Sequence, residues 1–282
     1  TAVTAVLTAG AIVGTTVAFH YTTTVNNYLD ADTYKIIKGN SDEDTEYFKS
    51  DFTSDEERES YEAELCAQVE AEGAALLKNN NNALPLASGA TVSLFGHGSV
   101  DLMYGGTGSG SADTSKAPNF KQALEDQGIQ VNSTLWDLYS SDDMMKNYSR
   151  ITPAAISDTL EANTQYAVNE APWSKLSSAE SSFADYGDAA IVVFSRSGGE
   201  GADLPSGENG TNDSWIKGQE GDGNYLALSA EEKELLQNLK TLKDNGTFKK
   251  IIVLINSSNA IEMDFLNPEI CGEDYGIDSA MW

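Results

Sequence analysis

The sequence contains little cysteine and little histidine, and this shortage excludes most metal and disulfide chemistry. Its 282 residues include two cysteines, Cys66 and Cys271, which are far apart and lack a C-x-x-C spacing. A disulfide framework or a zinc site is therefore not expected. The two histidines, His20 and His97, are too few and too separated for a histidine metal site, and neither is arranged with a serine or cysteine as in a catalytic triad. Hydrolytic chemistry must come from carboxylates, and we expect neither a metal nor another cofactor.

Basic residues are also scarce. Lys and Arg together number 17 against 44 Asp and Glu, which gives a formal net charge of -27. A field of this sign repels phosphate backbones and anionic lipid headgroups, so nucleic acid is not expected as a partner. The acids are scattered along the chain, which is typical of charge that keeps a secreted protein soluble.

One stretch near the start, from Ala2 to Phe19, lacks charged residues altogether. Its apolar residues alternate with Thr, Ala and Gly, which hydrocarbon tolerates in a helix, and its length just suffices to cross a bilayer. We expect residues 1–20 to form a membrane anchor or signal-like helix, with a buried core helix as the alternative. Residues 21–53 are polar and are expected to be a linker. The acidic remainder is then expected outside the cytoplasm, anchored at the cell surface or secreted.

A helix is predicted at the start of the body of the chain. Ser54 stands three residues before Glu57, which is the capping-box spacing that opens helices. Apolar residues at helical spacing then predict a helix to about Lys78 with one apolar face. These apolar residues are Tyr61, Leu65, Val69 and Leu76.

Strands and helices alternate through the rest of the chain. The predicted strands are apolar or β-branched runs at residues 91–95, 129–131, 189–194 and 251–255, and the last two are continuous enough to be covered on both faces. A helix is predicted at residues 119–127, and another follows the capping box of Ser229 and Glu232. Residues 135–186 show weak helical periodicity and are predicted to be mixed. The fold class is α/β, with a mostly parallel sheet, helices on both faces and an apolar amino-terminal helix.

Two glycine-rich loops follow predicted strands, where parallel sheets gather their ligand-binding loops. The first, residues 104–110, lets a neutral ligand or a neighbouring domain approach bare backbone. A nucleotide site is a weaker alternative, because the loop lacks the Lys-Ser/Thr pair of a P-loop. The second, residues 195–205, carries Glu200 between two glycines, so a carboxyl is presented on a projecting loop. Such a carboxyl can protonate a leaving oxygen if its surroundings raise its pKa.

Four motifs in this order resemble glycoside hydrolase family 3, the β-glucosidase group. They are EAEGAALLKN at residues 70–79, ALPL at 83–86, YGGTGSG at 104–110 and SRSGGEGADLP at 195–205. The resemblance covers residues 54–282 and implies that family's six-stranded α/β sandwich domain, incomplete at its end. Most members place a (β/α)8 barrel before this domain. The chain is similar to members with the reversed order and looks like an amino-terminal fragment.

The resemblance also implies a retaining mechanism. In this family an Asp on the barrel attacks the sugar, and a sandwich-domain Glu in a Gly-Glu-Gly-x-Asp context serves as acid and then base. Glu200 matches that context, whereas Leu204 replaces the Arg that commonly follows it. Retaining chemistry needs the two carboxyl groups about 5 Å apart. The barrel domain is therefore the expected partner and supplies the nucleophile. The expected substrate contacts are Gly105, Gly106, Ser109, Arg196 and Asp203, with a local ion pair as the alternative for Arg196 and Asp203.

The leading hypothesis is an exo-acting β-glycosidase, similar to β-glucosidases, that removes terminal sugars from oligosaccharides or glycosides. By itself this chain is expected to be inactive, because the nucleophile lies elsewhere. The alternative is a surface-anchored carbohydrate-binding or scaffolding module without catalysis. A nucleotide-binding α/β protein is a third and weaker hypothesis.

Overall fold

The computed structural model describes residues 2–28, 50–105, 114–152, 166–199, 204 and 224–282. They fall into two compact units, Thr1–Leu65 and Cys66–Trp282. Glu200 and Asp203, Gly106 and Ser109, and most of the predicted linker lie outside the described residues.

The first unit contains two consecutive helices, α1 (Ala2–His20) and α2 (Thr22–Tyr28). No residue of α1 is buried, and the helix, with a mean hydropathy of 1.8 over an 18-residue window, is long and apolar enough to cross a membrane. Helix α2 extends into the range predicted as a polar linker. The expected apolar amino-terminal helix is thus present.

The helix predicted from Ser54 to Lys78 is shorter than expected. Helix α3 spans Asp55–Gly73, and the Ser54 hydroxyl accepts the Glu57 N–H at 3.2 Å, but Leu76–Asn79 form strand β1. The backbones of Ala75 and Trp282 exchange hydrogen bonds in both directions, which draws this segment into the sheet. A long-range pairing that no local periodicity reveals therefore overrides the helical pattern after Gly73, a poor helix former.

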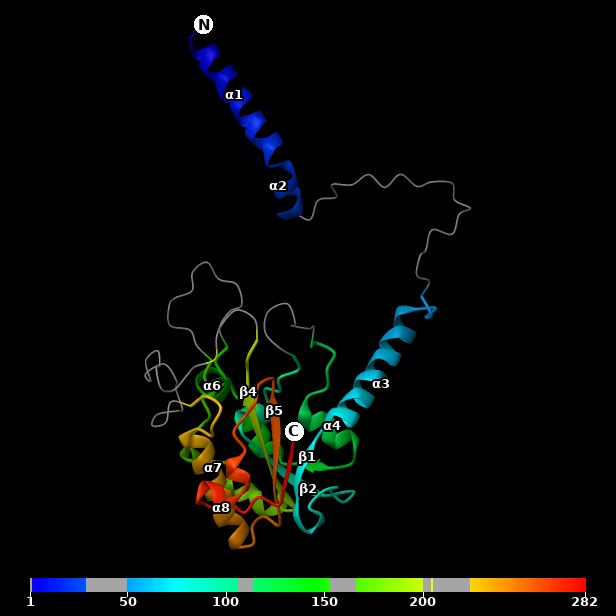
Figure 1. The fold of residues 1–282 in the computed structure, drawn as a ribbon, viewed down its shortest axis with the longest axis vertical. Helices are drawn as coiled ribbons and strands as arrows, with labels where there is room; N and C mark the ends of the chain where they lie inside the picture. The colour runs from blue at the N-terminus through cyan, green and yellow to red at the C-terminus, as the bar shows by residue number, and fades with distance from the viewer. Residues whose placement is uncertain (1, 29–49, 106–113, 153–165, 200–203, 205–223) are drawn as a thin grey trace. The chain divides into compact units, whose positions relative to one another are not determined.

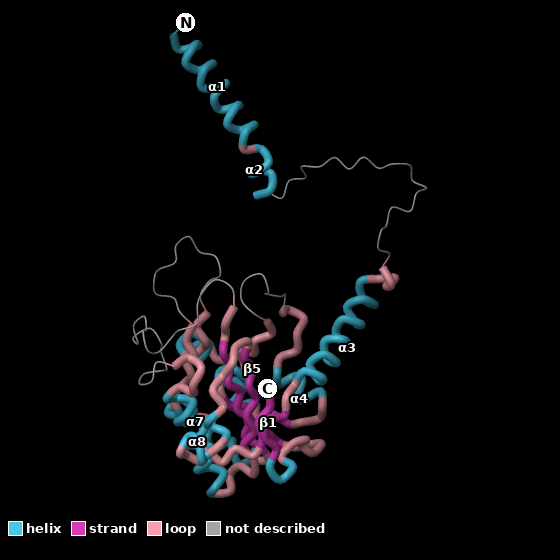
Figure 2. Tube along the Cα trace, viewed as in Figure 1, coloured by secondary structure: helices cyan, strands magenta, loops and turns pink. Residues whose placement is uncertain are grey.

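A six-stranded sheet forms the centre of the second unit, in the order β1-β6-β5-β4-β2-β3 (Figure 2). All neighbours are parallel except β1 and β6, which are antiparallel. The mostly parallel α/β fold is confirmed. The remaining strands are β2 (Thr91–Phe95), β3 (Gln130–Val131), β4 (Ala189–Arg196), β5 (Ile251–Ser257) and β6 (Ser279–Met281).

Helices lie on both sides of the sheet (Figure 1). They are α4 (Phe120–Asp126), α5 (Ser133–Tyr139), α6 (Asp142–Asn147), α7 (Ala230–Asp244) and α8 (Pro268–Cys271). Short 3₁₀ turns occupy Asn80–Asn82, His97–Ser99, Trp173–Leu176, Glu180–Tyr186 and Asp264–Leu266. The capping box of Ser229 and Glu232 opens α7 as predicted, with both reciprocal hydrogen bonds present.

Strand β4 divides the core into two apolar layers, because successive side chains of a strand point to opposite faces. Val192 and Phe194 join the larger layer, where they pack with leucines of α7. Ile191 joins the smaller layer, against which Leu124 of α4 packs. Every residue of β4 is buried. This central strand therefore carries its carboxyl end, and the loop that follows it, on a rigid support.

The larger layer should dominate the stability of the fold. Leu236, on α7, is fully buried in it. We expect Leu236→Ala to lower the free energy of unfolding by about 2–5 kcal/mol, because the substitution removes buried methyl groups and leaves a cavity. Urea denaturation measures the loss. Gln237→Ala, at the next and exposed position of the helix, is the control and should stay within about 0.5 kcal/mol. Equal effects of the two variants would contradict the assignment of this layer as the core.

Candidate active site

The carboxyl ends of β2, β4 and β5 meet at one edge of the sheet. The three strands are parallel, and β4 lies between β2 and β5 with continuous registers on both sides. Parallel α/β sheets place their ligand sites at this edge. Both glycine-rich loops start here, after β2 and after β4, so the fold brings together the two motifs that are separated in sequence.

A buried ion pair stands at the end of β4. Arg196 and Glu232 are both 0% exposed, and their charged atoms lie 2.6 and 2.7 Å apart in two parallel hydrogen bonds. The other donors of the guanidinium bond the backbone oxygens of Ser195, Tyr225 and Ala227. Burial opposes the charged form of Arg196, but the Glu232 carboxylate outweighs this penalty and raises the arginine pKa.

This geometry gives Arg196 a structural role. All five of its N–H donors are used inside the protein, so its guanidinium has none left for a sugar hydroxyl. We therefore do not expect Arg196 to contact the substrate directly. Its partner in the described part of the chain is Glu232, while Asp203 lies outside the described residues. The sequence identified Glu232 only as a helix cap, and nothing local signals its second role.

The stem of the second loop is held by side chains from other segments. The Ser197 carbonyl accepts the Tyr225 hydroxyl at 2.8 Å and the Asn259 side-chain N–H at 2.7 Å, and the Gly198 carbonyl accepts the Ser258 hydroxyl at 3.0 Å. Burial raises the pKa of Tyr225 to about 12, so the hydroxyl stays protonated and remains a donor. The described stem ends at Gly199, one residue before Glu200.

The stem of the first loop borders a small hollow. Its volume is ≈ 230 Å³, and it is lined by Met103, Tyr104, Gly105, Asn256, Ser257 and Ser258. Ordinary ligand pockets measure about 300–1,000 Å³. This edge of the chain thus offers one wall of a polar pocket. Gly105 lies on that wall, and its contact with substrate stays a prediction.

A second buried pair near the end of β2 was not identified from the sequence. The Nδ1 atom of His97 lies 2.9 Å from the Glu170 carboxylate, which also accepts the backbone N–H groups of His97 and Ala171. Burial, and next the charge of Glu170, raises the pKa of Tyr139 well above its usual value. His97 and Glu170 are 73 residues apart in the sequence, so only the fold shows that they form a pair. Among the described residues, no three His, Cys, Asp or Glu side chains gather as a metal site.

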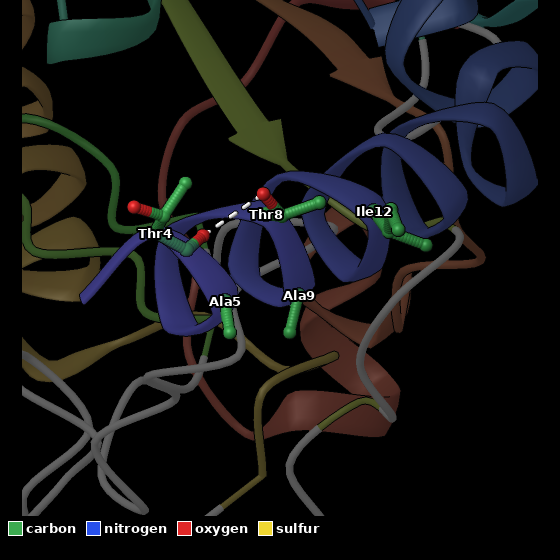
Figure 3. A pocket seen from close by; sticks show the side chains of 5 residues that line it. All are labelled: Thr4, Ala5, Thr8, Ala9 and Ile12. Atoms are coloured by element: carbon green, nitrogen blue, oxygen red, sulfur yellow. Dashed lines mark hydrogen bonds between the residues drawn. The ribbon is translucent and has the colours of Figure 1, made fainter. Parts of the chain in front are cut away.

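Helix α1 has a shallow groove of its own, lined by Thr4, Ala5, Thr8, Ala9 and Ile12 (Figure 3). The Thr8 hydroxyl donates to the Thr4 carbonyl at 2.9 Å. No titratable group lines this groove, so it offers no acid or base to a reaction.

Comparisons with known proteins agree with the fold. Residues 74–272 match the model of the glycosyl hydrolase family 3 C-terminal domain. A β-glucosidase of Ruminococcus albus is 30% identical over 207 residues, which cover 72% of this chain and 18% of that protein. β-Glucosidase A of Butyrivibrio fibrisolvens is 30% identical over 216 residues, covering 71% and 23%. The chain spans about a fifth of the length of these curated relatives.

Solved structures show the same architecture. A β-glucosidase from Paenibacillus barengoltzii superposes with a TM-score of 0.55 and 26% identity, over 78% of this chain and 21% of that one. β-Glucosidase 3B from Thermotoga neapolitana, in complex with glucose, gives 0.55 and 23%, over 80% and 27%; at that identity it supports the fold alone. The chain belongs to glycoside hydrolase family 3, and its second unit is the α/β sandwich domain of that family.

The ion pair at the end of β4 gives a sharp stability prediction. Glu232→Gln keeps the side-chain shape and the helix cap but leaves Arg196 buried without a countercharge. We expect it to lower the free energy of unfolding by about 3–5 kcal/mol. Asp244→Asn weakens the exposed pair of Asp244 with Lys240 on the same helix and should cost about 0–1 kcal/mol. Urea denaturation compares the two, and a Glu232→Gln loss as small as the control's would refute the buried-charge argument.

Proposed function

We propose that this chain is the acid/base-bearing part of a retaining, exo-acting β-glycosidase of the β-glucosidase type, with Glu200 as the proton donor. The observation that carries the proposal is the position of Glu200. In a chain of this family, it stands in the Gly-Glu-Gly-x-Asp motif four residues after the end of the fully buried strand β4. Its substrates are oligosaccharides or glycosides with a terminal sugar.

The chemistry needs a second carboxylate from another domain. An Asp carboxylate of a (β/α)8 barrel attacks the anomeric carbon, the glycosidic bond breaks, and Glu200 gives its proton to the departing oxygen. In the second half, Glu200 takes a proton from water, whose oxygen displaces the Asp and releases the sugar. The small, open hollow at the carboxyl edge supports this arrangement, because one wall of a pocket needs an opposing surface.

Substrate contacts are assigned to the two loops. We place Gly105, Gly106, Ser109 and Asp203 at the sugar, where backbone and short polar groups approach hydroxyls closely. Arg196 acts only indirectly, by fixing the end of β4 to Glu232. A non-catalytic carbohydrate-binding module remains the competing function, and the kinetics below separate the two.

Helix α1 is proposed to hold the protein in, or target it to, a membrane, with the acidic body on the extracytoplasmic side. The hydroxyls of Thr8, Thr15 and Thr16 donate to carbonyls four residues earlier at 2.8–2.9 Å. Such bonds satisfy polar groups internally, as a hydrocarbon environment requires. A signal sequence passes the same test of length and composition.

The proton-donor role predicts a split between substrate types. In the full-length protein that contains this chain, Glu200→Gln should lower kcat/KM about 100-fold or more for alkyl glycosides and disaccharides, whose leaving groups need protonation. Aryl glycosides with activated leaving groups should lose far less, because their oxygen leaves without a proton. Glu208→Gln, at the next glutamate along the chain, is the matched control and should be near normal. Equal losses on both substrate types would exclude Glu200 as the acid, and wild-type protein that binds sugars without turnover would favour the binding module.

Membrane association gives a separate prediction. Val13 lies in the middle of α1, and an arginine at the centre of a spanning helix costs about 2.5–3.5 kcal/mol of insertion. Val13→Arg should move the full-length protein from the carbonate-resistant membrane fraction to the soluble fraction, whereas Val13→Leu should leave it in place. A wild-type protein that is already soluble and retains α1 would contradict the anchor.

A further inference from the structure

The four residues that end β5 and follow it hold the stems of both glycine-rich loops. On one side, the Asn256 amide accepts the Met103 N–H at 2.6 Å and donates to the Met103 carbonyl at 3.0 Å. On the other side, Ser258 and Asn259 bond the stem of the second loop. One segment, residues 256–259, thus connects to both loops.

These contacts begin where the sheet ends. The last registered pair between β4 and β5 joins Arg196 to Ser257. Beyond it, the Ser258 N–H still donates to the Arg196 carbonyl at 3.2 Å. After that point, side-chain hydrogen bonds take the place of the backbone hydrogen bonds between the strands. The 256–259 segment therefore extends the rigidity of the sheet by two residues into the second loop.

Asn259 lies directly against Gly198. Its amide donates to the Ser197 carbonyl at 2.7 Å, and a Cβ at Gly198 would overlap its side-chain oxygen and nitrogen. Asn259 is itself held by Ser257, whose hydroxyl accepts the Asn259 N–H at 3.1 Å and donates to the Asn259 carbonyl at 2.7 Å. The absence of a side chain at Gly198 is what allows this close packing.

From this geometry we infer that Asn259 is a positioning residue for the acid/base group. The inference rests on the function proposed above. Asn259 fixes the peptide that joins Ser197 to Gly198, and Glu200 follows Gly198 by two residues. The carboxyl groups of a retaining enzyme stand about 5 Å apart, and a misplacement of about 1 Å can cost about 100-fold in rate. Asn259 touches the loop stem, so it acts on the reaction only through the placement of Glu200.

The first measurement is the leaving-group split. In the full-length enzyme, Asn259→Ala should lower kcat/KM about 10- to 100-fold for disaccharides and alkyl glycosides, and much less for activated aryl glycosides. Asn259→Asp keeps the shape but replaces the N–H donor with an oxygen that repels the Ser197 carbonyl, so it should not restore the rate. Equal losses on both substrate types would show a merely structural role and would overturn the inference.

The second measurement is a double-mutant cycle with Gly198→Ala. Alone, Gly198→Ala should reproduce the Asn259→Ala split, because its methyl group displaces the Asn259 amide. In the Asn259→Ala background the space is free, so Gly198→Ala should add little. The control background is Asn256→Ala, which loosens the other loop stem and does not contact Gly198. There Gly198→Ala should keep its full effect, and the same cost in all backgrounds would overturn the inference.

The two proposals fail in different ways. If Glu200→Gln shows no leaving-group split, the proposed function fails, and the Asn259 variants have no acid to misplace. If Glu200→Gln shows the split but Asn259→Ala and Gly198→Ala do not, the acid/base assignment stands and only the positioning role is refuted.

Discussion

The buried ion pair of Arg196 and Glu232 is the interaction on which the carboxyl edge of the sheet depends. It joins the last residue of the central strand to the first turn of α7. The Arg196 guanidinium also donates hydrogen bonds to the Tyr225 and Ala227 carbonyls. A charge buried this deeply is tolerated because every donor has an acceptor. Removing one partner would leave the other charge without compensation in the core. The pair therefore fixes where β4 ends and in which direction its chain continues.

The stem of the second glycine-rich loop is attached to this fixed point. Tyr225, whose carbonyl accepts from Arg196, returns its own hydroxyl to the Ser197 carbonyl. Asn259 contacts the same carbonyl from the β5 side. The loop therefore leaves the sheet between two anchors, one on each side. Rigid placement at the root suits the role proposed for this loop, in which its acidic group meets a nucleophile carried by a different domain.

Strand β4 has an apolar part within the core and a polar end at the carboxyl edge of the sheet. Its apolar residues fill the two layers of the core, and its last two residues, Ser195 and Arg196, carry the polar network at the carboxyl edge. Ser195 accepts a hydrogen bond from Arg150, which also pairs with Asp101 after β2. Polar side chains thus link the ends of the neighbouring strands where the ladders stop. Buried polar groups of this kind are stable only when their hydrogen bonds are made.

Much of this protein could be predicted from the sequence because the signals are local. Continuous apolar runs predicted β4 and β5, a short β-rich run ended by glycine predicted β2, and the Ser229 and Glu232 spacing predicted the start of α7. The order of four short motifs indicated the family, whereas the role of Glu200 in one of them stays a prediction.

The tertiary structure decided what depends on residues far apart in the chain. Strands β1 and β6 are short and form because each supplies backbone partners to the other across about two hundred residues. Arg196 has a structural role because the Glu232 carboxylate, 36 residues away, compensates its charge. Asn259 hydrogen-bonds Ser197, which is 62 residues away in the sequence. Periodicity and motif spacing record only near neighbours along the chain. Which polar side chains meet at the edge of the sheet is set by the packing of the whole domain.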